Sequence, residues 1–314
     1  MGNPYSGSTF FTFFQVLFTR IFNGDILHLA SDEIQVLVLM GVSVSGALVG
    51  TFLVLRNMTM VANALSHTIL VGIVGAYLLL SSLGALTDSF EGMSLLHLTL
   101  GSLLAGLLTT LLTEFLHKVT GLQEDAAVGL VFTSLFALGV LLVTLFTKNL
   151  HLGTEIVMGN VDAVVSGDLK IVYGALALNA ALLLLFFKEF KITTFDPGLA
   201  SALGFSPHFF NALLMILTSA TVMSALRSVG LLMVLGFLVG PTLIARTFTH
   251  TLSKLLFLAC GVGVGASLIG VALSRHILTT KGWGLSTGGL VVCVIVALFI
   301  ATAFKKQLTL RYSR

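Results

Sequence analysis

The chain has 314 residues, of which 56% are hydrophobic and only 9% are charged, and its mean hydropathy is +1.06. A soluble globular domain carries about 25% charged residues, so the composition excludes that class and predicts an integral membrane protein with several spans. The net charge of +3 comes mostly from residues that flank apolar stretches, which indicates membrane orientation rather than nucleic-acid binding.

Residues 1–33 predict an N-terminal interfacial segment. The Phe-rich stretch at 10–18 is too short to cross a bilayer, and residues 1–22 lack the basic region that a cleavable signal has at its start. We therefore expect a helix that lies at the membrane surface or is partly inserted.

Nine apolar windows follow, and they predict an all-α, polytopic permease-like domain of about eight to nine transmembrane helices over residues 34–304. The windows are 34–55, 61–83, 95–116, 126–147, 170–187, 209–226, 229–247, 255–274 and 284–304. The sixth and seventh windows form one long apolar stretch that is interrupted by Arg227-Ser-Val-Gly230. This interruption predicts either a tight external turn or a broken helix that faces a cavity.

Small residues indicate where helices approach each other closely. The pairs Gly46/Gly50 and Gly261/Gly265 have the four-residue spacing that favours such contacts in membranes. The two cysteines, at 260 and 293, lie inside apolar runs and are interpreted as packing residues rather than a disulfide or metal site.

Charged residues indicate the orientation of the spans. If the turn at 56–60 faces the cytoplasm, more Lys and Arg lie inside than outside, as expected for a membrane protein, and residues 305–314 form a cytoplasmic basic tail. The outer acidic residues then either form a negative vestibule that concentrates a cation or are solvated loop charges. They are Asp25, Asp32, Glu33, Asp88, Glu91, Glu155, Asp162 and Asp168.

One polar pair stands inside the second apolar window. Asn63 and His67 are four residues apart, so a helix places them on one face, one turn apart. Lipid cannot hydrogen-bond either side chain, so both must face protein or a water-filled path. A neutral imidazole is a ligand for transition-metal ions, and the alternative is a histidine that hydrogen-bonds between helices.

The segment 194–207 predicts a short helix between two spans. Asp196 suits the N-cap and Pro197 the first helical position, while Gly204 suits the C-terminal end. Leu199 and Leu203 give the expected helix, at 196–206, an apolar side. Such a helix either lies on lipid headgroups or docks a soluble partner.

The sequence contains no G-x-x-x-x-G-K-[ST], GxSxG or HExxH motif, so we expect no catalysis and no nucleotide binding by this chain itself. Two other classes remain open: a secondary transporter and a non-transporting scaffold. A secondary transporter needs intramembrane charges to couple an ion gradient. Glu114 is the carboxylate placed inside an apolar window, and Lys118 four residues later is expected to pair with it.

Four segments, in this order, resemble the membrane permease of bacterial ABC importers for manganese, zinc or iron. They are LRNMTMVANALSHTILVGIVGAYLL, LQEDAAVGLVFTSLFALGVLLV, TFDPGLASALGFSP and SVGLLMVLGFLVGPTLIAR. The resemblance covers about residues 34–304. It implies a type II ABC-importer-like permease in the bacterial inner membrane, which works as a dimer and carries no permanent cofactor.

The resemblance also implies partners and site residues. The implied partners are a cytoplasmic ATPase, an extracytoplasmic metal-binding protein and a second permease. The ATPase would bind at a coupling helix that carries Asp196, Pro197, Leu199, Leu203 and Gly204. In the family an aspartate and a histidine four residues apart form the intramembrane metal site; His67 matches the histidine.

The aspartate position holds Asn63. An amide brings no charge to offset a divalent ion, so two His and two Asn in a homodimer would disfavour a desolvated dication. Either a second, different permease supplies the carboxylate, or the ion passes hydrated and weakly held. The choice among manganese, iron and zinc stays open, because nitrogen and oxygen donors suit all three.

Overall fold

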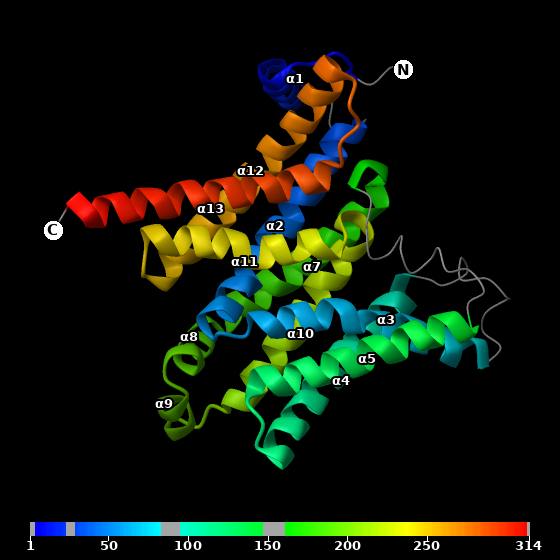
Figure 1. Cartoon of the computed structure of the whole chain (residues 1–314), viewed down its shortest axis with the longest axis vertical. Coiled ribbons are helices and arrows are strands. Elements are labelled where there is room, and N and C mark those ends of the chain that lie inside the picture. The colour runs from blue at the N-terminus through cyan, green and yellow to red at the C-terminus, as the bar shows by residue number, and fades with distance from the viewer. Residues whose placement is uncertain (1–3, 23–28, 83–94, 147–160, 313–314) are drawn as a thin grey trace.

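The computed structural model describes residues 4–22, 29–82, 95–146 and 161–312, and the regular elements in these ranges are all helical. The elements are α1 (Phe10–Phe22), α2 (Ser31–Leu55), α3 (Thr59–Ser82), α4 (Leu95–Thr120), α5 (Glu124–Phe146), a 3₁₀ turn η3 (Val161–Ala163), α7 (Ser166–Leu185), α8 (Phe187–Phe195), α9 (Pro197–Ala202), α10 (Pro207–Val229), α11 (Leu231–Phe248), α12 (Leu252–Lys281) and α13 (Thr287–Tyr312). The predicted all-α class is confirmed (Figure 1).

Each predicted apolar window falls wholly or almost wholly on one long helix. Among the described residues, α2, α4, α7, α10, α12 and α13 contain stretches long and apolar enough to cross a membrane. Helices α5 and α11 contribute the shorter apolar stretches Ala126–Leu142 and Met233–Phe248. The polytopic architecture is therefore confirmed, and the predicted count of eight to nine spans is approximate.

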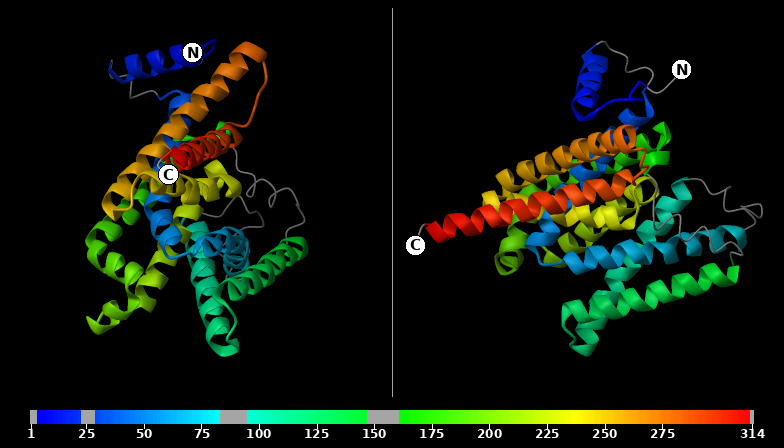
Figure 2. Two further views of the ribbon diagram at one scale, coloured as in Figure 1. Left: turned by 60° about the vertical axis from the view of Figure 1, so that its left-hand side comes forward. Right: turned by 45° about the horizontal axis from the view of Figure 1, so that its top comes forward.

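The long helices form two groups. Helices α3, α4 and α5 pack on one another, while α2 packs with α7, α11 and α12, and α13 packs on α11 and α12 (Figures 1 and 2). Helix α10 contacts both groups. The fully buried side chains of Leu39, Phe52, Leu217 and Phe237 place the main core between α2, α10 and α11.

Glycines allow the closest backbone contacts. A Cβ atom at Gly50 would collide with the carbonyl oxygen of Leu238, so α2 and α11 touch there. A Cβ atom at Gly101 would lie 2.6 Å from the carbonyl oxygen of Gly72, which brings α4 against α3. The close contact predicted at Gly261/Gly265 is not made within the described part of this chain, because none of its atoms lies within 4 Å of a Cβ built at either position.

The N-terminal segment is attached to the outer end of the helix bundle as defined by the predicted orientation. Helix α1 contacts α12 and lies across the ends of other helices (Figure 2). Tyr5 is fully buried and donates a hydrogen bond of 2.8 Å to Glu33. Burial, followed by this hydrogen bond to a carboxylate, raises the pKa of the Tyr5 phenol. The helix is as expected, and its position relative to lipid remains a prediction.

The interruption between the sixth and seventh windows is a single residue. Gly230 separates α10 from α11 with φ of +82°, a conformation that favours glycine. Ser228 and Val229 before it are buried. The tight turn is therefore packed within the protein rather than exposed as a loop. At the other end of the chain, α13 continues through Lys305 and Lys306, so the expected basic tail begins as part of that helix.

Candidate functional site

Asn63 and His67 both lie on α3 and are both partly buried. The imidazole ring of His67 packs against two rings of α5, with centroid distances of 5.0 Å to Phe132 and 5.4 Å to Phe136. Phenylalanine offers no metal donor, so α5 adds no ligand at these two contacts. The polar pair is therefore on one helix as predicted, and the aromatic contacts also fit the packing alternative.

No group of three or more His, Cys, Asp or Glu side chains in the described part of the chain lies close enough to hold a metal ion. Divalent metal ions in proteins take about four to eight ligands. Asn63 and His67 can supply two. Metal binding at this pair therefore requires further donors beyond these two side chains.

Helix α9 has the capping residues that the sequence predicts. Asp196 accepts a hydrogen bond of 2.9 Å from the backbone N–H of Leu199, and Pro197 occupies the first turn. Gly204 has φ of +86°, and the N–H of Phe205 donates to the carbonyl of Ala200 at 2.9 Å, as in a Schellman motif. The helix is thus 197–202, shorter than the expected 196–206, because the left-handed glycine ends it.

The apolar side of this segment is exposed. Leu199 is 50% exposed and Leu203 is 56% exposed, whereas Ala200 between them is fully buried. Phe195, which ends α8, is exposed as well. The α8–α9 segment stands at the same end of the bundle as the C-terminus, on the left of Figure 1. Its two leucines form an apolar surface that the described part of the chain does not cover.

Arg56 ties the α2–α3 turn to the elements on either side of α9. Its Nε donates to Thr194 Oγ1 at 3.0 Å and its Nη2 to Thr193 Oγ1 at 2.9 Å, both on α8. Its Nη1 donates to Asn211 Oδ1 in the first turns of α10. The guanidinium carbon lies 5.8 Å from the ring centroid of Phe190. Burial lowers the pKa of Arg56 to about 10, so the side chain stays charged at neutral pH.

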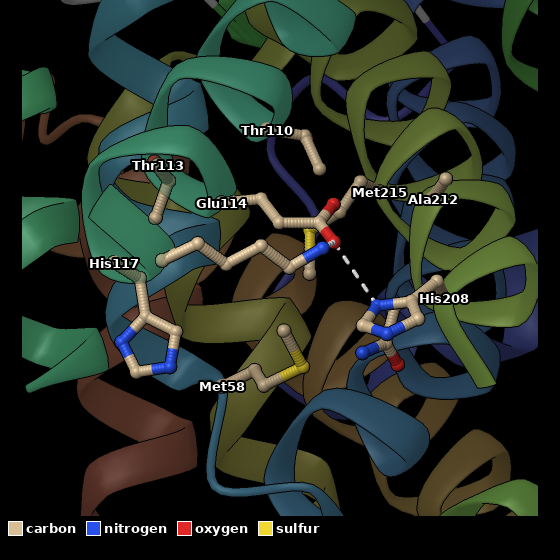
Figure 3. A pocket seen from close by; sticks show the side chains of 10 residues that line it. Met58, Thr110, Thr113, Glu114, His117, His208, Ala212 and Met215 are labelled. Carbon is tan, nitrogen blue, oxygen red and sulfur yellow. Dashed lines mark hydrogen bonds and ion pairs between the residues drawn. The ribbon is translucent and has the colours of Figure 1, made fainter. Parts of the chain in front are cut away.

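A cavity of about 210 Å³ opens beside this turn, between α4 and α10 (Figure 3). Glu114 Oε1 accepts from Lys118 Nζ at 2.7 Å, as the sequence predicts, and lies 3.0 Å from His208 Nδ1. Met58 and Met215 also line the cavity. Glu114 therefore pairs with Lys118 on its own helix, contacts the imidazole of His208 on α10, and is not a free intramembrane carboxylate.

The sequence does not predict the contacts of Arg56 or of His208. In the sequence, Arg56 is interpreted only as a cytoplasmic charge that follows an apolar window. His208 carries no sequence signal beyond its position after the Ser206-Pro207 helix start. In both cases the partner lies far away along the chain.

These features define a multi-pass, all-helical membrane protein with a polar pair in one span and a capped, exposed helix at one end. Residues 32–306 match the model of the ABC 3 transport family. Because the match covers most of the chain, the chain belongs to the ABC 3 transport family, whose members are membrane permeases of ABC transporters.

Three curated relatives of the chain are also named as membrane proteins of transport systems. The chain is 39% identical over 302 residues to a "Probable metal transport system membrane protein" of Chlamydia muridarum, covering 96% of this chain and 93% of that protein. It is 38% identical to the "Manganese transport system membrane protein MntD" of Bacillus subtilis, covering 73% and 78%. It is 35% identical to the "Zinc transport system membrane protein TroD" of Treponema pallidum, covering 84% and 72%.

A solved structure has the same fold. "PsaBC from Streptococcus pneumoniae in complex with Fab" matches with a TM-score of 0.76 and 26% identity, covering 94% of this chain and 100% of that chain. The chain is thus similar along nearly its whole length to membrane proteins of metal transport systems. The names of these relatives differ in the metal.

Proposed function

We propose that this chain is the permease subunit of an ATP-driven importer that moves a divalent transition-metal ion, manganese, iron or zinc, across the bacterial inner membrane. The observation that carries the proposal is the family match over residues 32–306 together with relatives named for metal transport. The chain has no P-loop, so ATP hydrolysis belongs to a separate ATPase chain.

His67 and Asn63 line the metal path in this proposal. The imidazole supplies a nitrogen donor and the amide a carbonyl oxygen, both from α3. The pair supplies two donors, so in this proposal a second permease completes the site and supplies the carboxylate that Asn63 lacks. Without that carboxylate the site would have no negative charge to offset the two positive charges of a desolvated metal ion.

The α8–α9 segment is the docking surface for the ATPase. Asp196 and Pro197 fix the start of α9, Gly204 fixes its end, and Leu199 and Leu203 present exposed apolar surface. Exposed leucines on a rigid, capped helix suit insertion into a groove of a soluble partner. An extracytoplasmic binding protein delivers the ion at the opposite end.

Vesicles test the function. The chain, with its cognate ATPase and any co-purifying permease, is reconstituted and the uptake of Mn²⁺, Zn²⁺ and Fe²⁺ is measured. We expect uptake only with both the ATPase and ATP. Uptake that follows an ion gradient without ATP would identify a secondary transporter instead, and a scaffold would give no uptake under any condition.

A further inference from the structure

The turn that holds Arg56 is a fixed connection between α2 and α3. Asn57 is left-handed with φ of +60°, and its N–H donates to the carbonyl of Val54 at 3.3 Å. The N–H of Met58 donates to the carbonyl of Leu53 at 2.9 Å. This is the pattern of a Schellman motif, so the backbone of Arg56 is held by helix capping bonds. Helix α3 begins at the next residue after Met58.

The guanidinium of Arg56 bonds to both sides of the α9 loop. Thr193 and Thr194 precede α9, and Asn211 follows it. The three acceptors are neutral oxygens, and a planar fork with several N–H groups is the side chain that can reach all of them at once. Any displacement of α9 with its flanking helices therefore either moves Arg56 or breaks these bonds.

Aromatic packing supports the same connection. The ring of Phe190 on α8 lies 5.4 Å from Phe52 on α2 and 5.3 Å from Phe210 on α10, by centroid distance. Arg56 lies over the same Phe190 ring. Phe52 and Phe190 are fully buried, so α2, α8 and α10 meet in a close-packed junction that resists internal rearrangement.

We propose that Arg56 is a positioning residue that transmits movement of the α8–α9 segment to α3, the helix that carries Asn63 and His67. This proposal rests on the proposed function, because it takes α9 as the ATPase contact and α3 as the metal path. The ATPase displaces α9, Arg56 carries the displacement through the capped turn, and the polar pair on α3 changes its exposure to the two sides of the membrane.

The test compares two arginine-to-lysine substitutions in the complete complex in vesicles. Arg56→Lys keeps the charge but cannot span acceptors on two helices. Arg275→Lys is the matched control, because Arg275 also bonds a buried partner, Asp32, but lies away from α9. We expect Arg56→Lys to lower the number of Mn²⁺ ions transported per ATP at least fivefold with the ATPase still bound, and Arg275→Lys to leave that ratio unchanged.

Removing a hydrogen-bond acceptor of Arg56 distinguishes loss of transmitted movement from a general loss of protein stability. Asn211→Leu should lower the same ratio by itself and should add nothing to Arg56→Lys, since both break one connection. If Arg56→Lys fails to fold, Asn211→Leu and Thr194→Val still test the connection. A wild-type ratio in these variants, or additive effects, would overturn the proposal.

A second measurement does not depend on uptake. ATPase binding should change the hydrogen exchange of amides 59–63 in the wild-type chain and not in Arg56→Lys. A wild-type complex that binds the ATPase but transports no metal would contradict the proposed function alone. Equal exchange changes in wild type and Arg56→Lys would contradict the Arg56 proposal alone.

Discussion

Arg275 of α12 binds Asp32 of α2 with both arms of its guanidinium, Nε to Oδ1 at 2.8 Å and Nη2 to Oδ2. The Asp32 carboxylate is buried, and Glu33 beside it accepts from Arg20 at 2.6 Å. These two carboxylates are therefore neither solvated loop charges nor a free negative vestibule. They bind α12 and the N-terminal segment to the outer end of α2.

The first prediction concerns this pair. Arg275→Leu should lower the free energy of unfolding by about 3 kcal/mol, because it removes the charge that pairs with both oxygens of the buried Asp32 carboxylate. Thermal unfolding in detergent measures the effect. The control Arg246→Leu, at an exposed position in the last turn of α11, should change stability by less than about 0.5 kcal/mol. Equal effects of the two variants would contradict the prediction.

The second prediction places His67 on the metal path. His67→Leu keeps α3 apolar but removes the nitrogen donor, so Mn²⁺ uptake should fall about tenfold or more, equivalent to about 1.4 kcal/mol. Protein level and ATPase association should stay near wild type. His250→Leu, at an exposed position after α11, is the control and should transport normally. Wild-type uptake by His67→Leu would make His67 a packing residue beside Phe132 and Phe136.

The third prediction concerns the exposed leucines of the α8–α9 segment. Leu203→Asp should weaken ATPase binding by about 2 kcal/mol, as expected for an apolar anchor at the centre of an interface. Leu285→Asp changes a similarly exposed leucine between α12 and α13 and should have no effect. Binding of the labelled ATPase to vesicles measures both. Unchanged binding and transport with Leu203→Asp would show that the ATPase docks elsewhere.

The fourth prediction concerns subunit composition. Because Asn63 stands where a charge is needed, the native complex should contain a second permease whose span supplies a carboxylate. Purification from the native membrane with identification of each subunit tests this. An active complex with two copies of this chain and no other permease would disprove it. In a complex forced to contain two copies, Asn63→Asp should increase metal binding.

The fifth prediction concerns the cap of α9. Asp196→Ala should destabilise the helix by about 1 kcal/mol, since it removes the acceptor for the N–H of Leu199, whereas Asp196→Asn keeps an acceptor and should be nearly neutral. Hydrogen exchange of residues 197–202 measures the difference. Equal exchange in the two variants would mean that the Asp196 cap contributes nothing to α9.

The sequence predicts features that depend on neighbouring residues. Apolar windows place the long helices, and Asp196 and Gly204 define the ends of α9, because helix capping is decided within one turn of the chain. It also predicts the pairing of Glu114 with Lys118, one turn away. These properties need no knowledge of the tertiary arrangement.

The features that remain unpredicted depend on residues far apart. The hydrogen bond between Arg56 and Asn211 joins residues that are 155 positions apart. The bond between Arg275 and Asp32 spans 243 positions. A charge count can place such residues at a membrane surface but cannot choose their partners. The same holds for small residues: Gly50 contacts the backbone of α11, whereas no described atom lies within 4 Å of a Cβ built at Gly261, although both glycines have the same spacing pattern.

The glycine contacts have a consequence for how the protein changes shape. Gly50 fixes α2 on α11, and Gly72 with Gly101 fixes α3 on α4, so neither pair can slide without a backbone collision. Few residues of α2 and α3 touch each other, although a turn of only three residues joins them. A change in the angle between α2 and α3 is therefore opposed by the capping bonds at Asn57 and Met58, so this turn passes a movement of one helix pair to the other. A substitution there would change the rate of switching more than the shape of either end state.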